Sequence, residues 1–272
     1  MVSIQEKTDY TNYEIIVVEN NSELPETFQY YQQLQRRYSN VKVVTWDGPF
    51  NYSAINNYGV KHATGDYYLM LNNDIEVISP TWMSEMLGYC QRRDVGIVGA
   101  KLYYADNTVQ HAGVVVGVGG FAGHILTRHR RGENGYFGRL VTIQDTSAVT
   151  AACLMIKRST FEQIGGFDEE FVVALNDIDL CLKVRDQGEL VVFNPYAELY
   201  HYESKSRGFE DTPEKKARFK KEIKRFRTKW SDVLEKGDPY YNPNLTLVRG
   251  DCSIRGEYER FEIVEEIEKG NK

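Results

Sequence analysis

An acidic residue and two amides follow directly after an apolar run in the first third of the chain. Residues 67–71 (YYLML) are too few for a helix and typical of a buried strand of a parallel sheet. Asn72, Asn73 and Asp74 come next, at the carboxyl end of this strand. Ligands of open α/β sheets bind at that edge, and magnesium commonly takes one or two carboxylates plus substrate phosphates. The segment therefore predicts a metal–diphosphate site, although Asn and Asp also favour ordinary polar turns.

Two further acidic segments lie in the second half of the chain. Residues 165–170 (GGFDEE) form a turn before an apolar stretch, and the glycine pair can equally be the end of a short helix. Residues 176–185 (NDIDLCLKVR) read as a helix that opens on Asn176 and Asp177. Such residues either cap a helix and meet the positive end of its dipole, or place a carboxylate where it acts as a general base. Both interpretations stay open at this point.

Two histidines are weaker candidates. His201 lies in the segment LYHYES, at the end of an apolar run, and His111 lies in the segment VQHAG. A single histidine is more often a structural residue than a metal ligand, although neutral imidazole is a common ligand in proteins. The pattern favours His201 over His111 without deciding its role.

The elements that must position these residues alternate between strand and helix, which is the signature of a doubly wound α/β sheet. A serine–proline pair at 79–80 predicts the N-cap and first residue of one of the helices. Residues 105–150 are rich in glycine and predict only a hairpin near 114–118. The expected strands are 13–18, 41–45, 66–71, 95–102, 151–157 and 190–193, and the expected helices are 25–38, 51–63, 80–90, 159–164, 176–187 and 213–230.

The order of these motifs along the chain resembles the inverting family 2 glycosyltransferases of the GT-A fold. The resemblance covers residues 13–206: a strand followed by NND, then GGFDE, then NDxDLC, then a late histidine. It implies an α/β fold with a mostly parallel sheet flanked by helices. We expect a glycosyltransferase domain over residues 1–210 and a helical extension over 211–272 that packs on it.

The resemblance also assigns residues to the donor side of a site. Asn72–Asp74 stands where the family has its D-x-D motif, so that Asp74 matches the metal-binding carboxylate and Asn72 departs from the usual Asp. His201 matches a late metal-binding histidine, and Glu19 matches an acidic residue that reads the nucleobase. The implied cofactor is Mg²⁺ or Mn²⁺, and the implied donor is a nucleotide-diphosphate sugar.

On the acceptor side, Asp177 matches the catalytic base of the family, with Asn176 in place of its usual acidic neighbour. Gly166, Phe167, Asp168 and Glu169 match a loop beside the acceptor and the donor sugar. The implied reaction is a single inverting displacement: a metal on Asp74 and His201 neutralises the diphosphate leaving group, and Asp177 takes the proton of an acceptor hydroxyl.

The amino terminus departs from the family pattern. Residues 2–4 read as the start of a strand, yet only ten residues separate Ile4 from Ile15, and parallel neighbours need a crossover of a dozen or more. The first strand–helix unit of the family is missing, and residues 1–12 look like the end of its helix and the following connection. We therefore expect the chain to begin inside the domain and to lack part of the donor pocket.

Composition narrows the class of protein. The net charge of −6 argues against a general nucleic-acid binder. Four cysteines without a C-x-x-C pair suit reduced, packed thiols in a cytoplasmic protein. The longest uncharged apolar run, residues 112–123, is too short and too rich in glycine to cross a bilayer.

A basic segment near the carboxyl end suggests an additional contact. Residues 214–230 carry nine Lys and Arg against two Glu, and they place Phe219, Ile223, Phe226 and Trp230 on one helical face. This face either packs on the domain or attracts the helix to anionic lipid. The second interpretation would give peripheral contact with the inner face of the membrane, where a lipid-linked glycan acceptor would lie.

We favour an enzyme that moves a sugar, of the hexosyl or rhamnosyl type, to a growing surface polysaccharide or lipid-linked glycan. A nucleotidyltransferase on a similar sheet would require a glycine-rich phosphate loop near the start, and none is visible. A truncated module that only binds glycans is the remaining alternative, and the unusual amino terminus is its main support.

Overall fold

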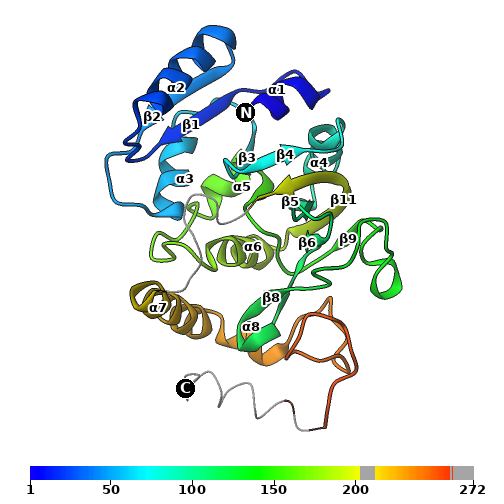
Figure 1. Cartoon of the computed structure of the whole chain (residues 1–272). Helices are drawn as coiled ribbons and strands as arrows, with labels where there is room; N and C mark the ends of the chain where they lie inside the picture. Colours follow the sequence, from blue (N-terminus) through cyan, green and yellow to red (C-terminus); the bar gives the residue numbers. More distant parts are fainter. Residues whose placement is uncertain (203–211, 258, 260–272) are drawn as a thin grey trace.

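The computed structural model describes residues 1–202, 212–257 and 259, and it is drawn in Figure 1. A seven-stranded sheet forms its centre, with β3, β10, β5, β11 and β4 in that order, β6 paired with β5, and β9 paired with β11. The strands are β3 (Tyr67–Leu71), β4 (Ile75–Val77), β5 (Val95–Tyr103), β6 (Val109–His111), β9 (Gln144–Asp145), β10 (Cys153–Lys157) and β11 (Leu190–His201). The α/β class is as expected.

The sheet is mixed, and less parallel than the sequence predicts. Strands β5 and β11 are parallel, but β10 lies antiparallel between β3 and β5, and β4 is antiparallel to β11. Apolar runs indicate that strands are buried and say nothing about the direction of their neighbours. The direction of β10 follows from its connection: Cys153 pairs with Leu71, so β10 starts at the edge where β3 ends.

A smaller parallel sheet of two strands, β1 (Ile15–Glu19) and β2 (Val41–Thr45), lies beside α2 (Pro25–Arg37) and α3 (Tyr52–Val60). The β-branched runs of β1 and β2 and the helix between them form the predicted strand–helix–strand unit. Residues 2–7 form helix α1 (Val2–Lys7), which agrees with a helix rather than a strand at this end.

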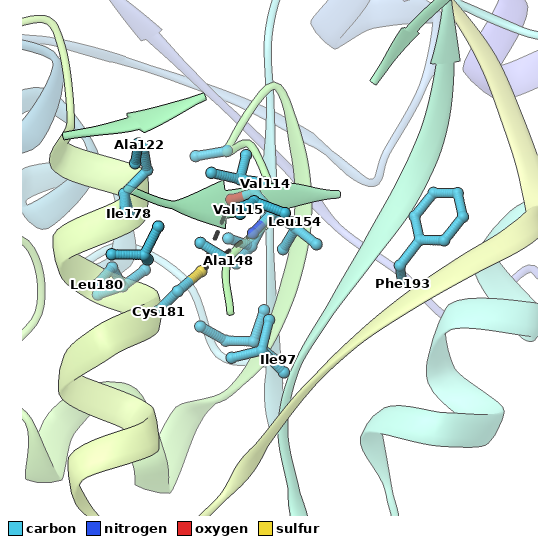
Figure 2. Packing of buried hydrophobic residues seen from close by; sticks show 14 of the residues in the cluster. Ile97, Val114, Val115, Ala122, Ala148, Leu154, Ile178, Leu180, Cys181 and Phe193 are labelled. Carbon is cyan, nitrogen blue, oxygen red and sulfur yellow. Dashed lines mark hydrogen bonds between the residues drawn. The ribbon is translucent and has the colours of Figure 1, made fainter. Parts of the chain in front are cut away.

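Helices cover both faces of the large sheet. Helix α4 (Trp82–Cys90) buries Trp82, Met86 and Cys90 completely against one face. On the other face, α6 (Asn176–Asp186) contributes Ile178, Leu180 and Cys181 to a core cluster that also contains Ile97 of β5 and Ala148 (Figure 2). The hairpin of β7 (Val114–Val116) and β8 (Ala122–His124) belongs to this second core and confirms the predicted hairpin.

Two boundaries differ from the sequence-based expectation for identifiable reasons. Helix α4 begins at Trp82 instead of Pro80, because the Ser79 hydroxyl donates to the Tyr196 carbonyl and accepts from the Glu198 amide, and so does not cap the helix. Strand β11 continues to His201, well beyond the predicted end at 193. A register shift between Asn194 and Glu198 accommodates Pro195, which in the sequence looks like the end of the strand.

The carboxyl part of the described chain contains α7 (Pro213–Lys229) and α8 (Ser231–Lys236), below the sheet in Figure 1. Ile223 and Phe226 join the second core, and Phe219 and Trp230 pack against its margin. The apolar face of α7 therefore packs on the domain, as the first interpretation had it. The predicted boundary at 210–211 lies outside the described residues. In the part of the chain described, no helix is long and apolar enough to cross a membrane.

Candidate active site

The main chain of residues 150–152, immediately before β10, connects several of the candidate residues. The amide of Ala151 donates to Asp177 Oδ2 at 3.2 Å, and its carbonyl accepts from the Tyr52 hydroxyl at 2.9 Å. The Asn72 amide donates to the next carbonyl, that of Ala152, at 3.0 Å. This turn thus joins the start of α6, the start of α3 and the end of β3, and it connects the segment that carries Asp177 to the segment that carries Asn72–Asp74.

The residues predicted to bind a metal lie where β3 and β11 end. Because β11 runs to His201 and pairs with β4, His201 lies beside Asp74: Nε2 is 3.1 Å from Asp74 Oδ1 and 3.2 Å from Asn72 Nδ2. Both side chains are largely buried. The other ring nitrogen of His201, Nδ1, is 2.7 Å from Gln110 Oε1. The structure therefore brings together the two residues that the resemblance implies as metal ligands.

The hydrogen-bonding roles at His201 test whether a cation fits. The amide oxygen of Gln110 only accepts, so Nδ1 carries a proton, and in neutral imidazole Nε2 then presents a lone pair. That lone pair can accept from the Asn72 side-chain amide, and it lies 3.1 Å from a carboxylate oxygen of Asp74, so an imidazole nitrogen and a carboxylate oxygen converge on one point. A histidine held by a carbonyl on its other nitrogen is the usual arrangement of a metal ligand. The donor set fits a divalent cation.

Within the described residues no three His, Cys, Asp or Glu side chains converge as a metal cluster. The single carboxylate of Asp74 is within the number that magnesium commonly takes from a protein, one or two, with substrate phosphates and water as its other ligands. Asn73, the middle residue of the NND segment, is exposed.

The candidate base stands at the beginning of α6. Leu175, the residue before the helix, has a left-handed backbone (φ 63°) although its side chain is buried. A non-glycine residue in this conformation costs roughly 1–2 kcal/mol, so the surroundings must hold it. Asp177 follows two residues later, half-buried, with Oδ1 accepting from the amide of Ile178.

Neither Asn176 nor Asp177 caps α6 as the simpler interpretation expects. Leu175 is the N-cap residue and makes no side-chain cap. The Asn176 side chain donates back to the Val173 carbonyl, and the Asp177 carboxylate reaches across to Ala151. Asp177 thus lies in the first turn of the helix, with its carboxylate directed to the 150–152 turn, which also joins the end of β3.

The loop of residues 166–169 is bound to α3, α6 and α7. Phe167 is buried with its ring edge-on to Tyr52, and the Gly166 carbonyl accepts from Lys183. The Asn57 side chain donates to Glu169 Oε1 at 3.0 Å. Through Phe167 and Tyr52 this loop touches the 150–152 turn, while its acidic side chains lie on the side of α3 and α7.

Asp168 faces α7. Its carboxylate receives Arg225 and Lys229, each at 2.9 Å. Burial alone would raise the pKa of Asp168, but the hydrogen bonds from Lys229 and Arg225 outweigh it and lower the pKa to about 2. These contacts show a strongly paired structural carboxylate.

Glu19 stands at the end of β1 on the smaller sheet. Its side chain is buried, and Oε1 accepts from the amide of Ser22 at 2.7 Å. The carboxylate therefore orders the turn that follows β1. The neighbouring Asn20 side chain fixes the end of β2 by donating to the carbonyls of Trp46 and Gly48.

Sequence reasoning missed Gln110 and Tyr52. Gln110 is a buried amide in β6, and its position between valine and histidine in an apolar run was the available signal. Tyr52 begins α3, and its sequence neighbourhood does not distinguish it from a core aromatic. His111 is wholly buried, accepts from the Thr150 amide through Nε2 at 3.4 Å, and has a pKa well below its usual value because of burial and then of His124 and His201 nearby.

Comparison with known proteins decides the family. The family model "Glycosyl transferase family 2" matches residues 2–165 of this chain. The chain belongs to glycosyl transferase family 2. Its GT-A fold agrees with a solved mannosyltransferase of Pyrobaculum calidifontis, PcManGT, in complex with GDP-Man and Mn²⁺: the TM-score is 0.60 at 15% identity, over 85% of this chain and 59% of that one.

Two relatives are similar over nearly the whole chain. The O-antigen biosynthesis protein RfbC of Myxococcus xanthus is 43% identical over 93% of this family 2 chain. The uncharacterised protein y4gI of Sinorhizobium fredii (strain NBRC 101917 / NGR234) is 50% identical over 92% of it. The chain spans only 19% of the first relative and 27% of the second, so both are much longer proteins.

Proposed function

We propose that this chain is an inverting glycosyltransferase, which moves a sugar from a nucleotide-diphosphate donor to a growing surface polysaccharide or lipid-linked glycan. The observation that carries the proposal is the 150–152 turn, which links the carboxylate of Asp177 to the Asn72–Asp74 edge. A base and a diphosphate site on opposite sides of one reacting carbon are what a single displacement requires.

On the donor side, Asn72, Asn73 and Asp74 would line the diphosphate and ribose, and Glu19 the nucleobase. Asp74 and His201 would hold Mg²⁺ or Mn²⁺, with Gln110 orienting the imidazole. The bound cation would offset the negative charge that develops on the diphosphate as it leaves. The Mn²⁺ in the PcManGT structure supports a divalent metal in this fold.

On the acceptor side, Asp177 would take the proton from the attacking hydroxyl. Its half-buried carboxylate is held by the amides of Ala151 and Ile178, which orients it without neutralising it. Gly166, Phe167, Asp168 and Glu169 would line the acceptor side through the contact of Phe167 with Tyr52. Asp168 contributes by holding this loop to α7.

The acceptor class rests on the relative that is named for O-antigen biosynthesis. A sugar of the hexosyl or rhamnosyl type and an acceptor at a membrane surface are parts of this proposal. Since the apolar face of α7 packs on the domain, any attraction to anionic lipid would come from the exposed lysines of that helix, among them Lys220, Lys221 and Lys224.

A transfer assay tests the proposal. The protein, with Mn²⁺, is incubated with a panel of uridine, guanosine and thymidine diphosphate sugars and with synthetic lipid-diphosphate-linked sugars as acceptors. The expected result is a product whose anomeric configuration, read by NMR, is opposite to that of the donor. Retention of configuration would contradict the assignment of Asp177 as a base, and absence of transfer with every donor would contradict the function.

A further inference from the structure

The segment that leads into α6, residues 171–175, forms a strap that is bound from two sides. On one side the Tyr52 amide donates to the Val172 carbonyl at 2.8 Å, and the Ser53 hydroxyl donates to the Phe171 carbonyl at 2.6 Å. These bonds attach the strap to the first turn of α3. Tyr52 is also the residue whose hydroxyl binds the 150–152 turn, so this side of the strap is continuous with the site.

On the other side the strap is bound by Glu222 of α7. This side chain is 2% exposed, and its two oxygens accept from the amides of Val173 at 2.8 Å and Ala174 at 3.4 Å. A buried carboxylate is costly unless its hydrogen bonds are made, and here successive main-chain amides make them. Arg218, one turn earlier on α7, lies 3.5 Å from the same carboxylate.

The same helix is fixed to the strap's surroundings by two more carboxylates. Asp179 of α6 is completely buried, and its Oδ1 receives Lys229 at 2.7 Å and the indole Nε1 of Trp230 at 2.9 Å. Asp168, just before the strap, binds Arg225 and Lys229. Helix α7 therefore contacts residues that precede the strap, residues of the strap itself and residues that follow it.

We propose that Glu222 is a positioning residue for Asp177, and that α7 is an integral part of the active site instead of an accessory extension. Glu222 holds the amides that immediately precede Leu175, whose left-handed backbone sets the direction in which α6 and its first-turn carboxylate emerge. This inference rests on the proposed function for the role of Asp177, and on the contacts above for the geometry.

The test compares Glu222→Gln with Glu214→Gln, which makes the same change at an exposed position of the same helix. Glutamine keeps the size of the side chain but replaces one accepting oxygen by a donor that faces an amide. We expect kcat to fall 10- to 100-fold in Glu222→Gln with the donor KM changed less than threefold, and neither constant to change in Glu214→Gln. Glu222→Asp, which keeps the charge, should recover part of the loss.

Amide hydrogen exchange supplies a second readout that does not depend on activity. The amides of Val173 and Ala174 should exchange at least tenfold faster in Glu222→Gln, while those of the buried strand β5 stay unchanged. An unchanged kcat, or a fall in kcat that merely follows the fraction of folded protein, would overturn the inference, as would unchanged exchange in the strap. If the wild type transferred no sugar but the exchange difference appeared, the proposed function would fail and the positioning of the strap would stand.

Discussion

The residues around Asp177 are bound by groups from several distant elements, whereas Asp74 lies beside His201, at the ends of two neighbouring strands. On the first side, the strap of residues 171–175 is bound by α3 and by Glu222. On the second side, the Asp74 carboxylate and the His201 imidazole face each other at 3.1 Å. The proposed base and the strap before it are thus held by several hydrogen bonds from distant parts of the chain, whereas the proposed metal ligands, Asp74 and His201, contact each other and adjacent polar side chains.

The largest effect should come from a change at Asp177, the proposed base. Asp177→Asn keeps the shape of the side chain but removes its ability to accept a proton, so we expect transfer to fall by about 10²- to 10⁴-fold with little change in donor affinity. Steady-state kinetics and donor titration measure the two quantities. Asp186→Asn, at the exposed end of the same helix, is the control and should be unaffected. Retained turnover, or a loss confined to donor binding, would place the base elsewhere.

The next largest effect is on the free energy of unfolding, and it comes from the buried contacts between α6 and α7. Asp179→Ala leaves Lys229 and Trp230 without their buried partner, so we expect the free energy of unfolding to fall by about 3 kcal/mol. Urea denaturation followed by circular dichroism measures it. Asp94→Ala, which breaks an exposed pair with Arg92, should cost less than about 1 kcal/mol. Equal losses in the two variants would show that α7 is only loosely docked.

At the proposed donor side, we expect the stability of the protein to depend on a bound ligand. Saturating Mn²⁺ with a nucleoside diphosphate should raise the unfolding free energy of the wild type by about 2–3 kcal/mol at a hundredfold excess over Kd. Asp74→Ala should abolish this increase, as seen in thermal melts with and without the ligand pair. Asn73→Ala, at the exposed neighbour, should keep most of it. The same increase in Asp74→Ala and the wild type would remove Asp74 from the metal site.

The smallest effect is the pH dependence of the unfolding free energy in acid. Because the folded protein lowers the pKa of Asp168 to about 2, below its unfolded value near 3.8, the ionised carboxylate stabilises the fold above about pH 4. This contribution, about 1–2 kcal/mol for a partly exposed group, should disappear as the pH falls from 4 toward 2. Unfolding free energies across that range should change less steeply in Asp168→Asn.

The control for this titration is Asp251→Asn. The pKa of Asp251 is also lowered to about 2, chiefly by hydrogen bonds from Ser253, but its partners lie within a few residues along the chain. Such local bonds persist in part after unfolding, so its pH slope should stay close to that of the wild type. If the unfolding free energy of Asp168→Asn depended on pH as steeply as that of the wild type, the ion pairs of Asp168 with α7 would not contribute to stability.

Much of the fold could be predicted from local pattern. The apolar runs of β3 and β5 and the helical stripe of α7 depend on residues near in sequence, and these elements form where expected. The direction of β10 and the length of β11 could not be predicted in this way. They depend on where a long connection returns to the sheet and on a bulge that carries the strand past Pro195.

The candidate site shows the same limit. Motif order was enough to select Asp74 and His201, which the structure places together, and to select Asp177, which remains a prediction as the base. The roles of Gln110 and Glu222 depend on pairings between residues far apart in the chain: Gln110 with His201, and Glu222 with the amides of the strap. A buried polar residue inside an apolar pattern is the signal that such partners leave in a sequence.

The buried thiol of Cys181 can be used to measure local opening of the protein next to the 150–152 turn. The Sγ of Cys181 is completely buried and makes hydrogen bonds with the amide and carbonyl of Val149, next to the turn at residues 150–152 (Figure 2). Burial raises the pKa of the Cys181 thiol well above its usual value, so the reactive thiolate does not form. Alkylating reagents also cannot reach the buried sulfur while the core is closed. The rate at which Cys181 is alkylated under native conditions therefore reports on local opening of this part of the molecule. A bound donor that makes the turn more rigid should lower this rate.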